Sequence, residues 1–191
     1  MVTIENTRRL VLEKMSSSEV VQLIAAGTSL PKGLTVRGWL DLTNCAELIT
    51  LPEGLTVGGS LNLNNCTRLT TLPDGLVVEG DLDLSNCTGL TTLPKDMVVG
   101  ERLNLRNCTG LTALPEDLAV DGSLDLSNCA GLTTLPKGLI VRGTLYLTDC
   151  TRLTSLPEDL VVRGDLDLTN CTRLTSLPDS MTVGGDLYLS K

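Results

Sequence analysis

The sequence predicts a solenoid, a fold in which short coils of chain stack side by side in register. A Leu-Pro pair recurs every 21 residues without insertion or deletion. A unit this short cannot bury its own leucines, so each copy must pack against its neighbours. Apolar residues make up 41% of the chain and aromatic residues only 2%, without phenylalanine, which suits a narrow aliphatic core. The leucines that begin the eight copies are Leu30, Leu51, Leu72, Leu93, Leu114, Leu135, Leu156 and Leu177.

Residues 1–29 precede the copies and have a different pattern. Ser16 and Glu19 have the spacing of a helix capping box, and an apolar stripe follows them. We predict a helix over residues 17–26 that acts as an N-terminal cap, covering the open edge of the first copy. Residues 7–15 fit a short helix and an edge strand equally well. An export or docking role for this segment is compatible with the cap.

Each copy contains one segment with the alternation of a half-buried strand, such as GDLDLSNC in the third copy. Leu82 and Leu84 are predicted to point into the core, and Asp81, Asp83 and Ser85 to point outward into water. Because the copies repeat in register, the strands should form one parallel sheet with neighbours ~4.8 Å apart. The outward positions should therefore line up as three columns of side chains.

The second half of each copy, LPxGLxV, returns the chain along the opposite side. It contains proline and glycine and is too short for a stable helix. We expect extended or tight-turn backbone there, with residues of the Leu76 and Val78 type facing the core. The predicted domain organisation is a cap over residues 1–29 and repeats over residues 30–191, the last of them incomplete.

The pattern LxLxxCxxL, seen at Leu82, Leu84, Cys87 and Leu90, occurs in full seven times. It resembles the leucine-rich repeat family, and the match covers residues 30–191. The LPxGL half is similar to the short bacterial forms, including those of secreted effectors. The resemblance implies a leucine-rich-repeat solenoid that serves as a scaffold for protein binding. The return segment lacks the helix of longer family members, so we expect a gently curved or nearly straight stack.

A column of cysteines occupies one position of the repeat. Structural zinc sites need thiolates that converge from different directions, whereas these side chains should lie parallel. Disulfides between neighbours are also excluded, because the Cβ atoms would stay ~4.8 Å apart when a disulfide needs about 3.8 Å. The family resemblance implies that each cysteine bonds inward to backbone groups at the bend after the strand. The seven are Cys45, Cys66, Cys87, Cys108, Cys129, Cys150 and Cys171.

The outward strand positions are where the copies differ, so we expect any working surface there. We call this surface the strand face. The first column is Trp39, Ser60, Asp81, Arg102, Ser123, Thr144, Asp165 and Asp186; the middle column is Asp41, Asn62, Asp83, Asn104, Asp125, Tyr146, Asp167 and Tyr188; the third column is Thr43, Asn64, Ser85, Arg106, Ser127, Thr148, Thr169 and Ser190.

All three aromatic residues of the chain lie on the strand face, and aromatic side chains are frequent anchors of protein interfaces. The face also carries seven Asp and two Arg, a local charge of −5 out of a net −8. We expect a basic or neutral protein partner, attracted in a salt-dependent way. The predicted partner-binding residues are Trp39, Asp41, Asp83, Arg102, Asp125, Tyr146, Asp167 and Tyr188.

Structural roles for the same residues are the alternatives. Trp39 could pack under the cap, and the aspartates could simply keep an exposed sheet soluble. Arg102 and Arg106 could pair with Asp83 and Asp125 across the strands.

Several function classes are disfavoured. Histidine is absent, so no Ser-His-Asp or Cys-His arrangement is available, and carboxylates open to water lack the raised pKa of a catalytic acid. We predict no enzyme activity, cofactor or metal, although weak calcium binding is an alternative. The acidic pI near 4.5 argues against nucleic acid. Without an apolar span or signal peptide, we expect a cytoplasmic protein, or one exported without a cleaved signal, with free thiols.

The sequence ends in the strand of the eighth copy, so Leu187 and Leu189 form a predicted self-association edge. Truncation of a longer chain and an end-to-end homodimer both fit this pattern. The alternative function is accordingly a structural or assembly protein. The copies are similar enough that a consensus-like repeat protein without an evolved partner also fits.

Overall fold

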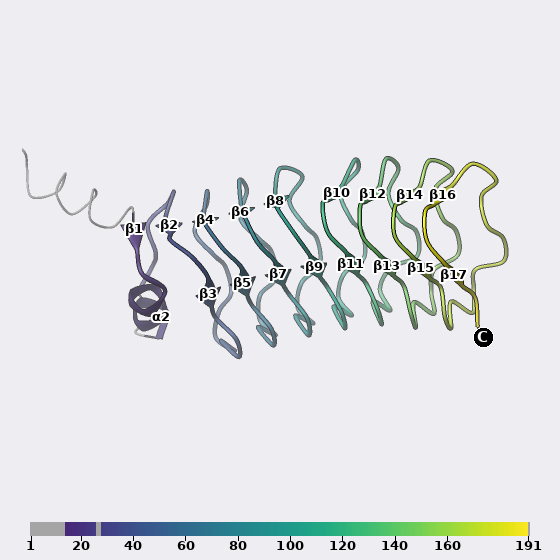
Figure 1. Cartoon of the computed structure of the whole chain (residues 1–191). Helices are drawn as coiled ribbons and strands as arrows, with labels where there is room; N and C mark the ends of the chain where they lie inside the picture. The colour runs from purple at the N-terminus through teal and green to yellow at the C-terminus, as the bar shows by residue number, and fades with distance from the viewer. Residues whose placement is uncertain (1–13, 26–27, 191) are drawn as a thin grey trace, which may run out of the picture.

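The structure is a computed structural model, and it describes residues 14–25 and 28–190. These residues form a parallel β-solenoid with one short helix at its N-terminal end, and the coils follow one another in a nearly straight row (Figure 1). The predicted solenoid with a 21-residue repeat is confirmed. Each strand pairs with its equivalent one copy away, as Leu82 of one coil pairs with Leu103 of the next.

The strand face belongs to an eight-stranded sheet in the order β17-β15-β13-β11-β9-β7-β5-β3. Its strands are short because only the LxL core of each copy is extended, and the chain bends directly afterwards. Their bounds are β3 (Leu40–Asp41), β5 (Leu61–Asn62), β7 (Leu82–Asp83), β9 (Leu103–Asn104), β11 (Leu124–Asp125), β13 (Leu145–Tyr146), β15 (Leu166–Asp167) and β17 (Leu187–Tyr188).

The return segments are extended, as predicted, and they pair into a second parallel layer in two runs. The first run has the order β1-β2-β4-β6-β8 and the second β10-β12-β14-β16. The bounds are β1 (Lys14–Met15), β2 (Thr35–Val36), β4 (Thr56–Val57), β6 (Val77–Val78), β8 (Val98–Val99), β10 (Ala119–Val120), β12 (Ile140–Val141), β14 (Val161–Val162) and β16 (Thr182–Val183).

The interruption between β8 and β10 coincides with a change in the turn that precedes these strands. In the first three copies this turn contains a glycine with φ between 67° and 69°. Aspartate replaces it in three copies, at Asp96, Asp117 and Asp159. Asp117 adopts φ 57°, whereas Asp96 does not have a positive φ. This difference does not by itself prevent pairing, because β12 and β14 pair although Gly138 has a φ of 69° and Asp159 does not have a positive φ.

The N-terminal cap contains helix α2 (Ser17–Ala25), which agrees with the predicted helix up to the last described residue. Its capping box is formed: the amide and hydroxyl of Ser16 donate to Oε2 of Glu19 at 2.9 and 2.7 Å. These bonds hold the pKa of Glu19 below its usual value. Strand β1 extends the second layer, so the end of residues 7–15 is an edge strand; the rest lies outside the described residues.

The core consists of aliphatic columns that run the length of the stack. Leu76, Val78, Leu82 and Leu84 of a central copy have no exposed surface, and their equivalents in the two adjacent copies are also buried, except Met97, which is half-buried. Each leucine packs against its copies in adjacent coils, which is how a repeat too small for its own core is stabilised.

The cysteine column has the inward bonds that the family resemblance implied. The Sγ atoms of Cys66 and Cys87 donate to the carbonyls of Leu42 and Leu63 at 3.2 and 3.1 Å. All seven cysteines are free thiols, and six of them are buried. Burial raises the pKa of Cys66 to about 11 and that of Cys87 to about 12. The column is therefore structural and poorly ionised.

No helix within the described parts of the chain is long and apolar enough to cross a membrane.

Candidate functional site

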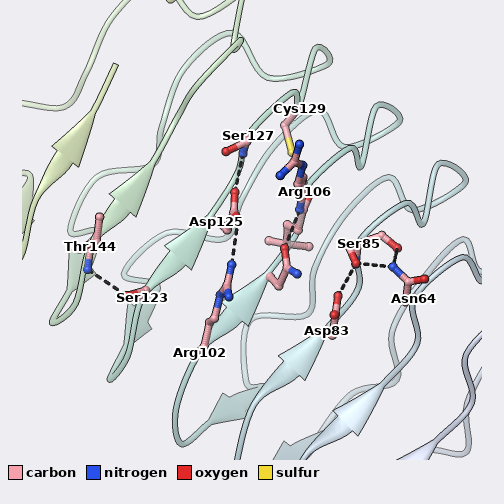
Figure 2. Close-up of polar contacts among 12 residues, drawn as sticks. Asn64, Asp83, Ser85, Arg102, Arg106, Ser123, Asp125, Ser127, Cys129 and Thr144 are labelled. Carbon is pink, nitrogen blue, oxygen red and sulfur yellow. Dashed lines mark hydrogen bonds and ion pairs between the residues drawn. The ribbon is translucent and has the colours of Figure 1, made fainter. Parts of the chain in front are cut away.

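The middle column of the strand face contains aspartate or asparagine in six copies, and each of these side chains closes an Asx turn. Its Oδ1 accepts the backbone amide two residues later, at 2.8–3.1 Å. Figure 2 shows two examples, Asp83 with Ser85 and Asp125 with Ser127. This role was not foreseen from the sequence, although the recurrent D-x-S, D-x-T and N-x-N patterns are typical of such turns.

The reason for the Asx turns lies in where the backbone ladder ends. The amides of Leu82, Leu84 and Asn86 donate to carbonyls of the next coil, whereas the amide of Ser85 between them donates to Asp83. The carbonyl of Leu84 is taken by the amide of Cys87 and the thiol of Cys108. The third-column amide therefore needs another acceptor, and the middle-column side chain supplies it.

The first column makes a second set of structural bonds, this time between coils. A side-chain oxygen in one copy accepts the amide of the first-column residue in the next copy, at 2.8–3.4 Å. Ser123, which accepts from Thr144, is one example (Figure 2). The acceptors are Ser60, Asp81, Ser123, Thr144 and Asp165.

Tyr146 and Tyr188 occupy the middle column but have no side-chain oxygen that can close an Asx turn. They are 37% and 49% exposed, so burial does not explain them either. Trp39 and Arg102 likewise interrupt the acceptors of the first column. At these four positions the sequence gives up a stabilising bond of about 1 kcal/mol for a large side chain. Arg102 makes an ion pair with Asp125 instead, so Trp39, Tyr146 and Tyr188 are the members of this group that the fold does not require.

The structure places two outward residues differently from the prediction. Asp125 and Ser85 were expected to be open to water, but they are only 7% and 6% exposed. Asp125 is covered by Arg102, whose Nη2 donates to its Oδ2 at 2.9 Å (Figure 2). Ser85 is enclosed by Asp83 and by the side-chain amide of Asn64, which donates to its Oγ at 2.5 Å. Asp125 is therefore a paired structural carboxylate rather than a free surface charge.

One of the predicted ion pairs is therefore present, because Arg102 pairs with Asp125 on the neighbouring strand. Arg106 uses its backbone amide to close the Asx turn of Asn104 at 3.1 Å, and its side chain is exposed. The exposed side of β9 therefore carries the basic residues of the strand face.

Trp39 lies next to the cap but does not pack under it, which corrects that reading. Its backbone carbonyl accepts the hydroxyl of Ser17, while its side chain remains 64% exposed. The indole lines a hollow of about 1020 Å³ between α2 and β3, together with Arg37 and Asp41. The tryptophan is separated from Tyr146 by four intervening strands of the eight-stranded sheet.

A further column, at the bend before each cysteine, went unrecognised in the sequence. Seven asparagines or aspartates there adopt φ between 58° and 61°, the left-handed conformation that asparagine tolerates best. Their side chains bond from coil to coil, as when Nδ2 of Asn107 donates to Oδ1 of Asn86 at 2.8 Å. The asparagine or aspartate that precedes each cysteine was the available signal. The column is Asn44, Asn65, Asn86, Asn107, Asn128, Asp149 and Asn170.

No group of three or more metal-ligating side chains converges among the residues that the structure describes. No family model, curated protein or solved structure matches the chain. The candidate site is accordingly defined by geometry alone: exposed aromatic side chains and carboxylates on a flat parallel sheet.

Proposed function

We propose that the protein is a non-catalytic scaffold of the leucine-rich-repeat kind that binds a protein partner through its strand face. The observation that carries this proposal is the exposure of Tyr146 and Tyr188 at positions where the other six copies have a turn-closing aspartate or asparagine. Exposed tyrosines supply a large contact area at small entropic cost, which is why they are common at interfaces.

The leucine-rich-repeat assignment is supported by the LxLxxCxxL pattern together with the inward bonds of the cysteines. The short extended return segment agrees with the compact bacterial forms of the family. An effector or host-interaction role remains part of the proposal for the same reason.

Capture experiments with matched variants test the proposal. Tyr146→Asn and Tyr188→Asn introduce the residue type that closes the turn in other copies, so the fold should be kept while the aromatic surface is lost. Ile140→Thr is the control, because Ile140 is an exposed apolar residue of the second layer, 38% accessible. We expect the double tyrosine variant to lose a partner that the parent and the control both retain. Equal capture by all three proteins would contradict binding through the strand face.

Self-association is the second candidate, and the exposure of two leucines favours it. Leu187 and Leu189 are 38% and 53% exposed, whereas their equivalents Leu166 and Leu168 are buried. Sedimentation at several concentrations tests this candidate. A parent that dimerises and a Leu189→Asp variant that does not would support it, and a monomeric parent at every concentration would exclude it.

A further inference from the structure

Charge is distributed unevenly along the strand face. The two arginines of the face lie on or next to β9, and Arg102 neutralises Asp125. Beyond β11 the columns contain Asp165, Asp167 and Asp186 and no basic residue. None of the four ion pairs among the described residues involves these three carboxylates. The C-terminal half of the face therefore carries unneutralised negative charge.

The two exposed tyrosines lie in this same half and are in register. Tyr146 pairs with Asp167 on the next strand, and Asp167 pairs with Tyr188 on the one after. With strands ~4.8 Å apart, the two tyrosines are about 10 Å apart and Asp167 lies between them. Two contacts of about 3.5–4 Å span about 7–8 Å, so a flat cation touches both rings when they lean towards each other by about 2 Å. We call Tyr146, Asp165, Asp167, Asp186 and Tyr188 the acidic tyrosine strip.

The hydrogen bonds of the strip show which of its oxygens the fold already uses. Asp167 accepts the amide of Thr169 through Oδ1 at 2.8 Å and the hydroxyl of Thr148 through Oδ2 at 2.9 Å. Asp165 uses Oδ1 for the amide of Asp186 at 2.8 Å. Asp167 is thus a fixed charge at the base of the strip, while Oδ2 of Asp165 can receive an external donor.

A second observation reports the potential at this end of the molecule. The charges of Asp186, Asp165 and Asp167 raise the pKa of the Tyr188 hydroxyl above its ordinary value. Because the Tyr188 side chain is exposed, this negative potential extends into the solvent in front of the sheet, where a partner would approach.

Arginines on either side of the strands limit the shape of a basic partner. Arg163 precedes β15 by a few residues and Arg173 follows the bend after it, and both are exposed. A broad basic surface would be repelled by them. An extended segment that runs along the first and middle columns, across the strands, meets the carboxylates and the tyrosines without meeting these arginines.

We propose that the acidic tyrosine strip binds an extended basic segment of a protein partner, with an arginine guanidinium held between Tyr146 and Tyr188. Arginine fits better than lysine, because its planar guanidinium stacks on aromatic rings and can donate two bonds to one carboxylate. This inference rests on the proposed function and specifies the chemistry of the partner.

A titration with defined peptides tests the proposal. Fluorescein-labelled octa-arginine, octa-lysine and octa-glutamate are titrated with the full chain, and binding is followed by fluorescence anisotropy at low and high salt. We expect octa-arginine to bind more tightly than octa-lysine and octa-glutamate not to bind. Replacing both tyrosines by asparagine should weaken octa-arginine binding by about tenfold, the loss of two aromatic contacts with a cation.

A matched pair of charge variants separates the strip from general attraction to an acidic protein. Asp165→Asn and Asp81→Asn each remove one charge from the first column, and each keeps the oxygen that accepts the next coil's amide. Asp165→Asn should weaken octa-arginine binding, and Asp81→Asn should leave it unchanged. Circular dichroism melting curves show that each variant is folded.

The outcomes distinguish this inference from the function on which it rests. Equal effects of the two aspartate variants, or unchanged binding by the tyrosine variant, would reduce the interaction to attraction by the net charge of −8 and overturn the proposal. If no basic peptide binds but the tyrosine variant still loses a captured partner, the scaffold function stands and the basic segment is wrong. If no basic peptide binds and the tyrosine variant also keeps its partner, the scaffold function and the basic segment are both wrong.

Discussion

Asp41 shows how one side chain of the strand face can serve the fold. Its Oδ1 accepts both the amide and the hydroxyl of Thr43, at 2.9 and 2.5 Å. These two bonds favour the ionised carboxylate and lower the pKa of Asp41 below 3.8. For Asp167, burial raises the pKa, but the bonds from Thr169 and Thr148 outweigh it and the pKa is again lowered.

The lowered pKa values predict how stability depends on pH. A carboxyl group whose pKa is lower in the folded than in the unfolded chain contributes stability above its unfolded pKa, and this contribution is lost as the pH falls through the folded pKa. The parent should therefore lose stability below about pH 4. Asp41→Asn and Asp167→Asn keep the acceptor oxygen but do not titrate, so each variant should lose less stability than the parent when the pH falls. Urea unfolding at neutral pH and near pH 3 measures the difference, and an unchanged acid loss in both variants would contradict it.

The thiols give a second prediction at this scale. Six cysteines are buried with raised pKa values, whereas Cys45 is half-buried at the N-terminal end. Cys45 should therefore react first with a thiol reagent in the native protein, and all seven should react once the chain is unfolded. Mass spectrometry of the labelled peptides identifies the site. Fast native labelling of Cys108 or Cys129 would show that the column is accessible.

Much at the residue scale was predictable from the repeat, because the position of a residue within the 21-residue unit assigns Leu82, Leu84 and Cys87 to the core. The same rule places Tyr146 and Tyr188 on the strand face. It does not reveal which outward side chains are bound in the fold. That depends on where the backbone ladder stops, and the burial of Asp125 depends further on the reach of Arg102 from the neighbouring coil.

At the scale of the element, the return strands form a second layer that is interrupted once, between β8 and β10. Glycine adopts the required positive φ without strain, as Gly54 and Gly138 do at 67° and 69°. The sequence indicates an extended return segment, because LPxGLxV is too short for a helix. The interruption between β8 and β10 was not predicted, and the φ of the turn residue does not explain it, since β6 and β8 pair across the same difference between Gly75 and Asp96.

Replacing Asp117 by glycine should stabilise the protein. Asp117 has φ 57°, which costs a residue with a side chain roughly 1 kcal/mol that glycine does not pay. We expect Asp117→Gly to raise the free energy of unfolding by about 0.5–1 kcal/mol. Gly138→Ala is the converse control and should destabilise, because Gly138 has φ 69°. Urea unfolding measures both, and a destabilised Asp117→Gly protein would show that the aspartate side chain matters more than its backbone.

For the whole molecule, the important property is that each coil contacts only its neighbours. Stability then approximates a sum of coil and interface contributions, and removal of one complete coil leaves every remaining register intact. The lack of insertions made this architecture predictable from the sequence alone, whereas the surface chemistry of the two ends was only partly predictable.

Deletion of residues 93–113, one complete 21-residue unit, should give a folded and less stable protein. Deletion of residues 93–103 joins segments half a coil out of phase, so that core leucines would meet outward positions, and it should prevent folding. Circular dichroism and urea unfolding distinguish the two. Similar behaviour of both deletions would contradict a stack held in register.

The ladder of asparagine side chains also constrains how the chain can be produced. Four of its members begin the tripeptide Asn-Cys-Thr, the acceptor pattern for N-linked sugars: Asn65, Asn86, Asn107 and Asn170. In three of them the acceptor nitrogen donates to the preceding coil at 2.8–2.9 Å. An oligosaccharide on that nitrogen cannot fit between coils ~4.8 Å apart.

Secretion from a eukaryotic host should therefore yield glycosylated chains that do not stack. Alanine occupies the threonine position naturally at Ala46 and Ala130, so replacing the four sequon threonines by alanine removes the acceptors without disturbing the ladder. That variant should be secreted unglycosylated and folded, while the parent from the same cells gives a heterogeneous, poorly folded product. Stacking and sugar attachment compete for the same nitrogen atoms.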